Sequence, residues 1–254
     1  MVTYSDLSIH FIQINTAGIG SIAEEATGAD AVGFEALADP RVRTALNLAI
    51  DREAVAEELF AGFASPLGQP FGPGGPLSPT EDMQYGYDPD RARALLAEAG
   101  YGEGLTLDMM ASGSVSTDLL SLVASYFEAI GVSVEIEVIE AATFNDGWVA
   151  GQFPHLRFAT WSNPEQALEL LIQSGDLIST YSNPTVDELI DLQATQVDPA
   201  QRKATIDELT RVMHEDAAWV FLWSTDAIVG LAPGVSGWVP HTTHVPVANV
   251  TVAD

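Results

Sequence analysis

Cysteine is absent from the 254-residue sequence, and lysine occurs once, as Lys203. Without cysteine the chain can form no disulfide bond, no thiolate metal site and no cysteine nucleophile. Long apolar runs are also absent: no stretch of about eighteen or more apolar residues occurs, so no segment is predicted to span a membrane. Residues 1–25 lack a basic stretch followed by an apolar core, so we expect no secretion signal within this chain.

Basic residues are scarce as a class. Nine lysines and arginines stand against 36 aspartates and glutamates, which gives a formal net charge of −27 at pH 7. The nine are scattered along the chain: Arg41, Arg43, Arg52, Arg91, Arg93, Arg157, Arg202, Lys203 and Arg211. Because nucleic acids are bound through clustered lysine and arginine, this distribution argues against a nucleic-acid partner.

The acidic residues belong to a folded protein. Hydrophobic residues make up 47% of the chain and the mean hydropathy is +0.15, which is enough to build a core and unlike an acidic disordered chain. At molar salt the Debye length falls to about 3 Å, and this screening quenches repulsion among surface carboxylates. The composition therefore predicts a salt-adapted source and a fold that weakens in dilute buffer.

Helix starts are marked by a repeated dipeptide. An Asp or Asn followed by Pro supplies a capping oxygen and a preset first turn. This pair occurs at Asp39-Pro40, Asp88-Pro89, Asn163-Pro164, Asn183-Pro184 and Asp198-Pro199. Asp51 is expected to cap a further helix, and a Gly- and Pro-rich stretch at residues 62–87 is expected to form a long surface loop.

The middle of the chain alternates between strand and helix patterns. The expected order is strand 105–111, helix 118–130, strand 132–139, helix 141–150 and strand 156–161. Such alternation is typical of α/β folds with right-handed crossovers and at least partly parallel strands. In strand 132–139, apolar and polar residues alternate, which predicts a solvated side or an edge position.

Two further strands are expected near the chain ends. Residues 217–223 form an apolar run that fits a buried strand, and residues 7–14 carry a strand pattern with no partner nearby in sequence. The late segments 227–231 and 245–252 are the candidates to pair with residues 7–14. This pairing would bring the two ends of the chain together.

Six blocks in order resemble the family 5 extracellular solute-binding proteins of ABC importers. Residues 39–54 (DPRVRTALNLAIDREA) resemble the signature helix pair of that family, and residues 87–101 (YDPDRARALLAEAGY) the next block. The others are residues 129–136 (AIGVSVEI), 181–189 (YSNPTVDEL), the helix at 198–215, and 217–222 (AAWVFL). The resemblance therefore covers residues 39–222.

The resemblance implies a fold and a domain organisation. It implies an α/β lobe of the type II periplasmic-binding-protein kind, with a mixed sheet flanked by helices and the other lobe largely missing. Family members are about twice as long, and this chain is similar to their C-terminal half. Residues 1–15 would be a crossover strand from the missing lobe, 16–223 the C-terminal lobe, and 224–254 a return segment toward the missing lobe.

The same resemblance implies a function. Members capture a small solute, such as a peptide, a nickel chelate or a sugar, in a cleft between two lobes and deliver it to ABC permease subunits. The protein would act outside the cell or at its surface, without enzymatic activity, and the missing N-terminal half would be a further partner. The alternative is a truncated or split remnant that serves as an interaction or structural module without transport.

Candidate ligand residues follow two of the predicted strands. Ligands of open α/β sheets sit beyond the carboxyl ends of the strands, which are here Ser112 to Ser114 and Trp161 to Asn163 with Ser162 between them. Trp161 is a ligand wall or a packing residue, Asn163 a ligand contact or a helix cap, and Ser112 and Ser114 ligand contacts or local backbone partners. Trp223 is a further candidate for the cleft, with ordinary packing as the alternative.

One substitution bears on the solute. In peptide-binding relatives, the loop that Trp161 to Asn163 resembles carries a tryptophan and, within a few residues, an aspartate that pairs with the amino terminus of the peptide. Trp161 matches the tryptophan, whereas the loop is shortened and the aspartate is absent. Asn163 can accept a hydrogen bond there but supplies no charge, which puts peptide specificity in doubt.

Other motifs are weaker. There is no Gly-x-Ser-x-Gly sequence, and the stretch that starts at His214 (HEDAA) lacks the second histidine of a zinc protease helix, so His214 is expected to act at a helix C-terminus. His241 and His244 have a chelating spacing but no nearby carboxylate, and Gly18 to Ala23 (GIGSIA) is a lone dinucleotide-like motif. We therefore expect no metal and no cofactor.

Overall fold

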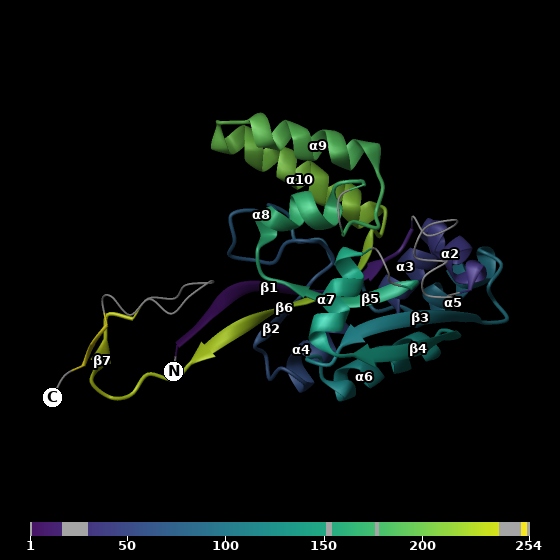
Figure 1. Ribbon diagram of the computed structural model, residues 1–254, viewed down its shortest axis with the longest axis horizontal. Coiled ribbons are helices and arrows are strands. Elements are labelled where there is room, and N and C mark those ends of the chain that lie inside the picture. Colours follow the sequence, from purple (N-terminus) through teal and green to yellow (C-terminus); the bar gives the residue numbers. More distant parts are fainter. Residues whose placement is uncertain (1, 17–29, 151–153, 176–177, 239–249, 253–254) are drawn as a thin grey trace.

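The computed structural model describes residues 2–16, 30–150, 154–175, 178–238 and 250–252. A six-stranded sheet runs through these residues in the order β2-β6-β1-β5-β3-β4 (Figure 1). Its strands are β1 (Val2–Ile14), β2 (Ala64–Pro66), β3 (Leu105–Ser112), β4 (Val132–Ile139), β5 (Leu156–Trp161) and β6 (Trp219–Val229). β3 pairs in parallel with β4 and β5, whereas β1 pairs antiparallel with β5 and β6, and β2 antiparallel with β6. The sheet is therefore mixed.

Helices cover both faces of the sheet. One core cluster joins strand residues to the first group of helices: α2 (Ala31–Ala38), α3 (Pro40–Leu48), α4 (Arg52–Glu58), α5 (Pro89–Glu98) and α6 (Thr117–Glu128). The second cluster joins the other face to α7 (Ala141–Val149), α8 (Pro164–Ala167), the π-helical turn η1 (Leu168–Ile172), α9 (Pro184–Thr195) and α10 (Pro199–Glu215). The result is a three-layer α/β sandwich.

The capping predictions are confirmed. Each of the five Asp/Asn-Pro pairs begins a helix, with the Asp or Asn side chain accepting a backbone N–H hydrogen bond and the proline in the first turn. Asp51 caps α4 in the same way through the Ala54 amide. These caps depend on two or three neighbouring residues only, which is why the sequence predicts them correctly.

The strand predictions are also confirmed. β3, β4 and β5 occupy the expected ranges, and β4 lies at the edge of the sheet, as its alternating pattern indicates. The first strand pairs with the late segment that follows Trp223, for example Tyr4 with Ala227. Of residues 245–252, the structure describes only the last three, and Thr251 and Val252 pair with β7 (Val235–Ser236) as β8.

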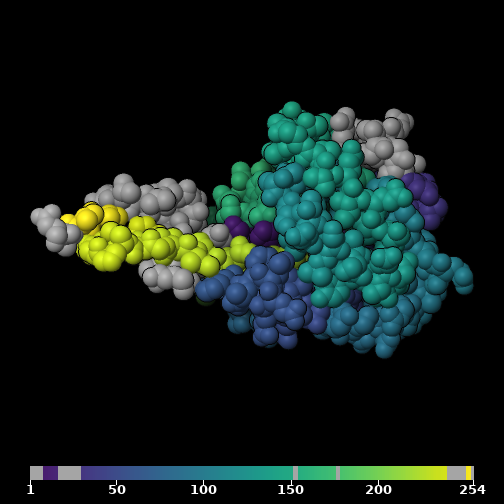
Figure 2. Space-filling view, turned by 90° about the horizontal axis from the view of Figure 1, so that it is seen from below, coloured from purple at the N-terminus to yellow at the C-terminus, as the bar shows by residue number. Residues whose placement is uncertain are grey.

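The start of β1 and the end of β6 pair with each other and form an arm. Val2 lies opposite Val229, so the start of β1 and the end of β6 run together away from the helices. Figure 2 shows the yellow-green residues after β6 projecting from the rest of the described chain. The prediction that long-range pairing brings both chain ends together is therefore confirmed for these residues.

The prediction of a surface loop at residues 62–87 is wrong in part. The segment contains β2, and the side chains of Leu67, Phe71 and Leu77 are buried in the second core cluster. Gly68 allows the segment to fold on itself, because a Cβ there would lie 2.4 Å from the Met83 carbonyl oxygen. A few apolar side chains spaced among glycines and prolines anchor the segment in the core. They follow no periodic pattern, so the sequence did not indicate their burial.

Candidate functional site

The carboxyl ends of β3 and β5 lie side by side, because these parallel strands are neighbours in the sheet. Ser112 is the last residue of β3, and Trp161 is the last residue of β5. Gly113, Ser114, Ser162 and Asn163 follow them and are exposed. The two predicted ligand loops therefore lie at the same end of the sheet. We call this carboxyl end of β3 and β5, with the residues that follow each strand, the open edge.

The loop after β3 is closed by its own hydrogen bonds. The Ser112 and Ser114 hydroxyl oxygens lie 2.9 Å apart, and the Ser114 amide donates to the Ser112 hydroxyl over 3.3 Å. Ser112 is buried, whereas the Ser114 residue is exposed. This geometry corresponds to the alternative in which the serines bond the local backbone. Of the two, Ser114 is the one that is exposed to solvent.

The loop after β5 holds its tryptophan in place. The Trp161 indole N–H donates to the Asn163 carbonyl oxygen over 2.8 Å, and the residue is half-buried. The Asn163 side-chain oxygen accepts from the Gln166 amide over 3.2 Å as the cap of α8. The Asn163 side chain therefore caps a helix, its carbonyl fixes the indole, and Ser162 between them is exposed.

Trp223 lies in the core instead of at the edge. Its exposed fraction is 0%, and its ring packs 5.4 Å from the Phe60 ring on the face of α2–α6. The cause is an irregularity in β6, where His10 pairs with Trp223 but the next residue of β1 pairs with Phe221. Such a bulge turns the following side chain to the other face of the sheet. The structure thus places Trp223 in the packing role.

The first strand contributes residues that the sequence did not single out. Ile9 pairs with Trp161 on one side and with Ser224 on the other, so β1 crosses the open edge between β5 and β6. His10 Nδ1 lies 3.0 Å from the Thr160 hydroxyl oxygen. The pairing of β1 with β5 has no local signal in the sequence, which is why these residues could not be assigned to the edge.

An aromatic cluster lies beneath Trp161 on the face of β5 that α7 covers. The Trp148 ring meets the Trp161 ring edge to face, with centroids 5.7 Å apart and an interplanar angle of 90°. The guanidinium carbon of Arg157 lies 3.0 Å from the centroid of Trp148 and 4.0 Å from that of Phe144. Burial lowers the pKa of Arg157 to about 8.

One small cavity lies beside β1 in the part of the chain that the structure describes. This cavity of about 10 Å³, bordered by Ile9, Phe71 and Pro164, is large enough for about one water molecule. Larger grooves, of about 300 and 460 Å³, lie on the 62–87 segment, and Pro79 and Thr80 line both. Drug-sized solutes occupy pockets of roughly 300–1,000 Å³, so the cavity at Ile9 cannot enclose such a solute.

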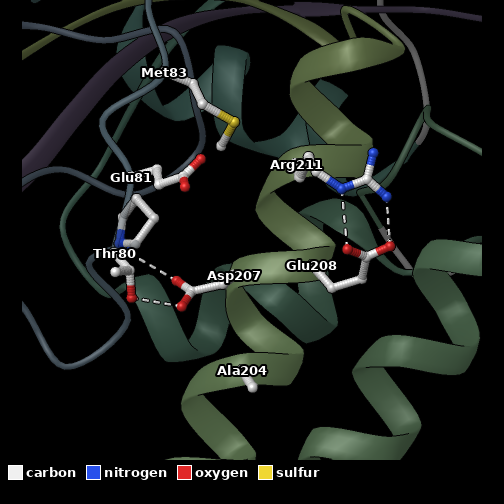
Figure 3. Close-up of a pocket in the computed structure, with 8 residues that line it drawn as sticks. Thr80, Glu81, Met83, Ala204, Asp207, Glu208 and Arg211 are labelled. Carbon is white, nitrogen blue, oxygen red and sulfur yellow. Dashed lines mark hydrogen bonds and ion pairs between the residues drawn. The ribbon is translucent and has the colours of Figure 1, made fainter.

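The 300 Å³ groove lies between the 62–87 segment and α10, with a hydrogen-bonded contact across it and an ion pair along α10. Figure 3 shows Asp207 reaching Thr80 and Glu208 reaching Arg211 across or along its rim. The Thr80 amide and hydroxyl both donate to Asp207, at 2.8 and 2.6 Å. These carboxylates already have partners, so we assign the groove a structural role.

Metal and cofactor motifs gain no support from the described residues. Among them, no group of three or more His, Asp or Glu side chains is placed to hold a metal ion. His241, His244 and the Gly18 to Ala23 motif lie outside the described residues. His214 sits in the last turn of α10, where its Nδ1 lies 2.7 Å from the Gly68 carbonyl oxygen. No helix in the described ranges is long and apolar enough to cross a membrane.

Curated relatives of the chain are binding proteins, by name. It is 29% identical over 210 residues to the glutathione-binding protein GsiB of Pectobacterium atrosepticum, a match that covers 75% of this chain and 40% of that protein. It is 26% identical over 213 residues to heme-binding protein A of Haemophilus influenzae, covering 78% of this chain and 39% of that one. The chain thus spans about 40% of the length of these relatives.

Solved structures share the fold. HbpA2 of Haemophilus parasuis superimposes with a TM-score of 0.82 at 19% identity, covering 99% of this chain and 49% of that one. The oligopeptide-binding protein AppA of Bacillus subtilis, solved with a nonapeptide, gives 0.80 at 19% identity over 100% of this chain and 52% of its own. The expected periplasmic-binding-protein lobe is therefore confirmed. Residues 1–188 match the family described as bacterial extracellular solute-binding proteins, family 5 Middle, and the chain belongs to that family.

Proposed function

We propose that this chain is the solute-capturing part of an ABC importer and that its open sheet edge forms one wall of the solute cleft. The observation that carries the proposal is the half-buried Trp161, held by the Asn163 carbonyl at the carboxyl end of β5 in a protein of this family. Exposed Ser162 and Asn163 follow it directly, and exposed Ser114 follows the neighbouring strand β3, so the groups at this end of the strands are neutral and polar. An indole beside such groups suits a small organic solute, because it offers apolar contact next to hydrogen-bonding positions.

The opposing wall is proposed to lie outside this stretch of chain. The cavity beside Ile9 is too small for a solute, and the chain spans only about 40% of its curated relatives. Residues 1–15 and 224–254 would then link to the other lobe as crossover and return segments, with the lobe itself at 16–223. The arm in which Val2 pairs with Val229 supports this arrangement, since it leads away from the lobe.

The chemistry of the edge limits the solute class. A peptide amino terminus needs a carboxylate for a charge-assisted hydrogen bond, and Asn163 provides none. The loss is roughly 1–3 kcal/mol. Relatives and neighbours named for glutathione, haem and the peptide STSA give the first candidates to compare. We propose a solute, peptide-like or other, that this wall holds by ring contact and neutral hydrogen bonds.

The partners and the place of action follow from this role. The closed, loaded protein would deliver its solute to the permease subunits of the importer, outside the cell or at its surface. The protein itself carries out no reaction in this scheme. The names of its relatives, which are binding proteins, support this role.

The test is a thermal shift screen of this chain, alone and with the remaining lobe supplied as a second polypeptide. Glutathione, haem, Ser-Thr-Ser-Ala and neutral oligosaccharides are the probes. We expect at least one probe to raise the melting temperature when both lobes are present, because a ligand that binds only the native state stabilises it. Trp161→Ala should abolish that rise, whereas Tyr87→Ala, which removes an exposed aromatic side chain that packs against Tyr126, should retain it.

Two outcomes would contradict the proposal. A probe that stabilises the Trp161→Ala variant as well as the parent would place the solute elsewhere. No stabilisation by any probe with both lobes present would favour the alternative, a remnant that serves as an interaction or structural module.

A further inference from the structure

Arg157 is a buried cation with unused hydrogen-bond donors. Its exposed fraction is 1%, and its Nε and Nη1 have no hydrogen-bond partner among the residues that the structure describes. It also joins none of the ion pairs found in those ranges. A buried charge of this kind is costly unless another interaction compensates it.

Two rings of α7 provide that compensation. Phe144 and Trp148 are four residues apart, so both project from the same side of the helix. Their centroids lie 4.0 and 3.0 Å from the guanidinium carbon of Arg157. Stacking of a guanidinium on aromatic faces is attractive, and the attraction is stronger when the site is desolvated. Arg157 therefore connects β5 to α7 through these two rings.

The Trp148 ring contacts both Arg157 and Trp161 and so links the buried arginine to the open edge. One contact is with Arg157, another is the edge-to-face packing with Trp161, and its indole N–H donates to the Ile178 carbonyl oxygen over 3.3 Å. Arg157 and Trp161 are four residues apart on a strand, so their side chains leave the sheet on the same side. The three side chains form one continuous row from the sheet interior to the candidate site.

We infer that Arg157 is a positioning residue for Trp161, acting through Trp148, whose ring it fixes against the edge of the Trp161 indole. The guanidinium itself does not lie at the open edge and does not contact the solute. It acts by setting the orientation of the Trp161 indole through Trp148. Its importance for binding rests on the proposed function, since that proposal makes Trp161 part of the solute wall. The geometry of the row can be tested without any solute.

The test uses the circular dichroism couplet that arises from two close, fixed indoles. The difference between the spectra of the parent chain and its Trp161→Phe variant isolates the signal that involves Trp161. We expect Arg157→Met to lose most of this couplet while the chain still melts cooperatively. Phe144→Leu is the matched control: it removes the other ring on Arg157, for which no contact with Trp161 is found, and should keep the couplet at a lower melting temperature.

Three results would overturn the inference. The first is a couplet that persists in folded Arg157→Met. The second is a Phe144→Leu variant that loses the couplet as fully as Arg157→Met does, because that would indicate general loosening. If Arg157→Met does not fold, Arg157→Lys decides, because an ammonium keeps the charge but lacks the planar stacking group; an undiminished couplet there would refute the role. A failed solute screen with an intact positioning result would instead count against the proposed function alone.

Discussion

Two buried arginines in this protein are stabilised in different ways. Arg52, at the start of α4, is 3% exposed and donates hydrogen bonds to the main-chain oxygens of Phe221, Asn47 and Ile50 and to the Asn47 side chain. Arg157, on β5, is 1% exposed and rests against two rings with donors unused. Neither is paired with a carboxylate in the described residues.

The difference separates a part of the fold that is held by hydrogen bonds from a helix that is held by stacked rings. At Arg52 every acceptor is a fixed part of the α3–α4 corner and of β6, so the guanidinium ties helices to the sheet. At Arg157 the contacts are the ring faces of Phe144 and Trp148, which hold one helix, α7, against the sheet. Trp161 and the open edge lie at the end of the Arg157 row, whereas the hydrogen bonds of Arg52 lie within the α3–α4 corner and β6.

The largest expected effect comes from breaking the Arg52 region. Arg52→Met removes the Arg52 donor from the Phe221 carbonyl and leaves the Asn47 side-chain oxygen with the Phe221 amide alone, so we expect a loss of roughly 3 kcal/mol in the free energy of unfolding. Urea denaturation measures it. The control is Arg91→Met, which breaks an exposed pair with Glu98 and should cost far less. A loss at Arg52 no greater than the control's would contradict the conclusion that these hydrogen bonds hold this part of the fold.

Salt distinguishes the buried arginines from the surface charges. The seven other cations all pair with carboxylates, and the net charge of −27 leaves most carboxylates unpaired. We expect the melting temperature of the parent chain to rise between about 0.05 and 3 M salt, because screening removes repulsion among them. The destabilisation caused by Arg52→Met should stay constant over that range. A melting temperature that does not change with salt would remove the prediction of salt adaptation.

Arg157→Met is expected to cost less than Arg52→Met. The lost ring contacts are worth roughly 2 kcal/mol, and removal of an unpaired buried charge offsets much of that. The net change in unfolding free energy should therefore lie within about 1 kcal/mol of zero. The same urea titrations measure it. Equal losses of unfolding free energy in Arg52→Met and Arg157→Met would show that hydrogen bonds and ring contacts stabilise the two arginines to the same extent.

A small effect is also expected at Asp207, a carboxylate that is paired with a cation, Lys203. Burial raises the pKa of Asp207, but hydrogen bonds from Lys203 and Thr80 outweigh it, so the pKa lies below the ordinary 3.8. The carboxylate therefore stabilises the fold above pH 3.8, and this stabilisation is lost as the pH falls through the lowered pKa. Asp207→Asn should cost under about 1 kcal/mol at neutral pH.

Acid titration of unfolding checks that effect. The difference in unfolding free energy between the parent chain and Asp207→Asn should shrink as the pH falls, because protonation removes the hydrogen-bonded carboxylate. A difference that widens as the pH falls would contradict the direction of the shift.

Local signals explain what the sequence predicted. Capping by Asp39 or Asn183 involves adjacent residues only, and the alternation in Val132–Ile139 shows the edge position directly. The site loops followed, because the carboxyl ends of β3 and β5 are fixed once the strands and their parallel order are known.

Non-local pairing explains what the sequence missed. The bulge that turns Trp223 into the core arises where β6 meets β1, and Ile9 reaches the edge only because β1 pairs with β5. Arg157 carried no signal, since a lone arginine in a strand pattern does not show which rings will cover it. The two strand pairings join residues about 150 or more apart in the chain, and the Arg157 stack depends on where α7 packs, so neither could be read from short windows.

The most direct test of the account is the indole NMR spectrum of the two-lobe protein, with ¹⁵N-labelled tryptophan, titrated with the probe that gives the largest thermal shift. The account predicts that the Trp161 signal moves most, that Trp148 follows it, and that the buried Trp219 and Trp223 stay in place. A titration that leaves Trp161 unmoved would contradict the assignment of the solute wall to this edge.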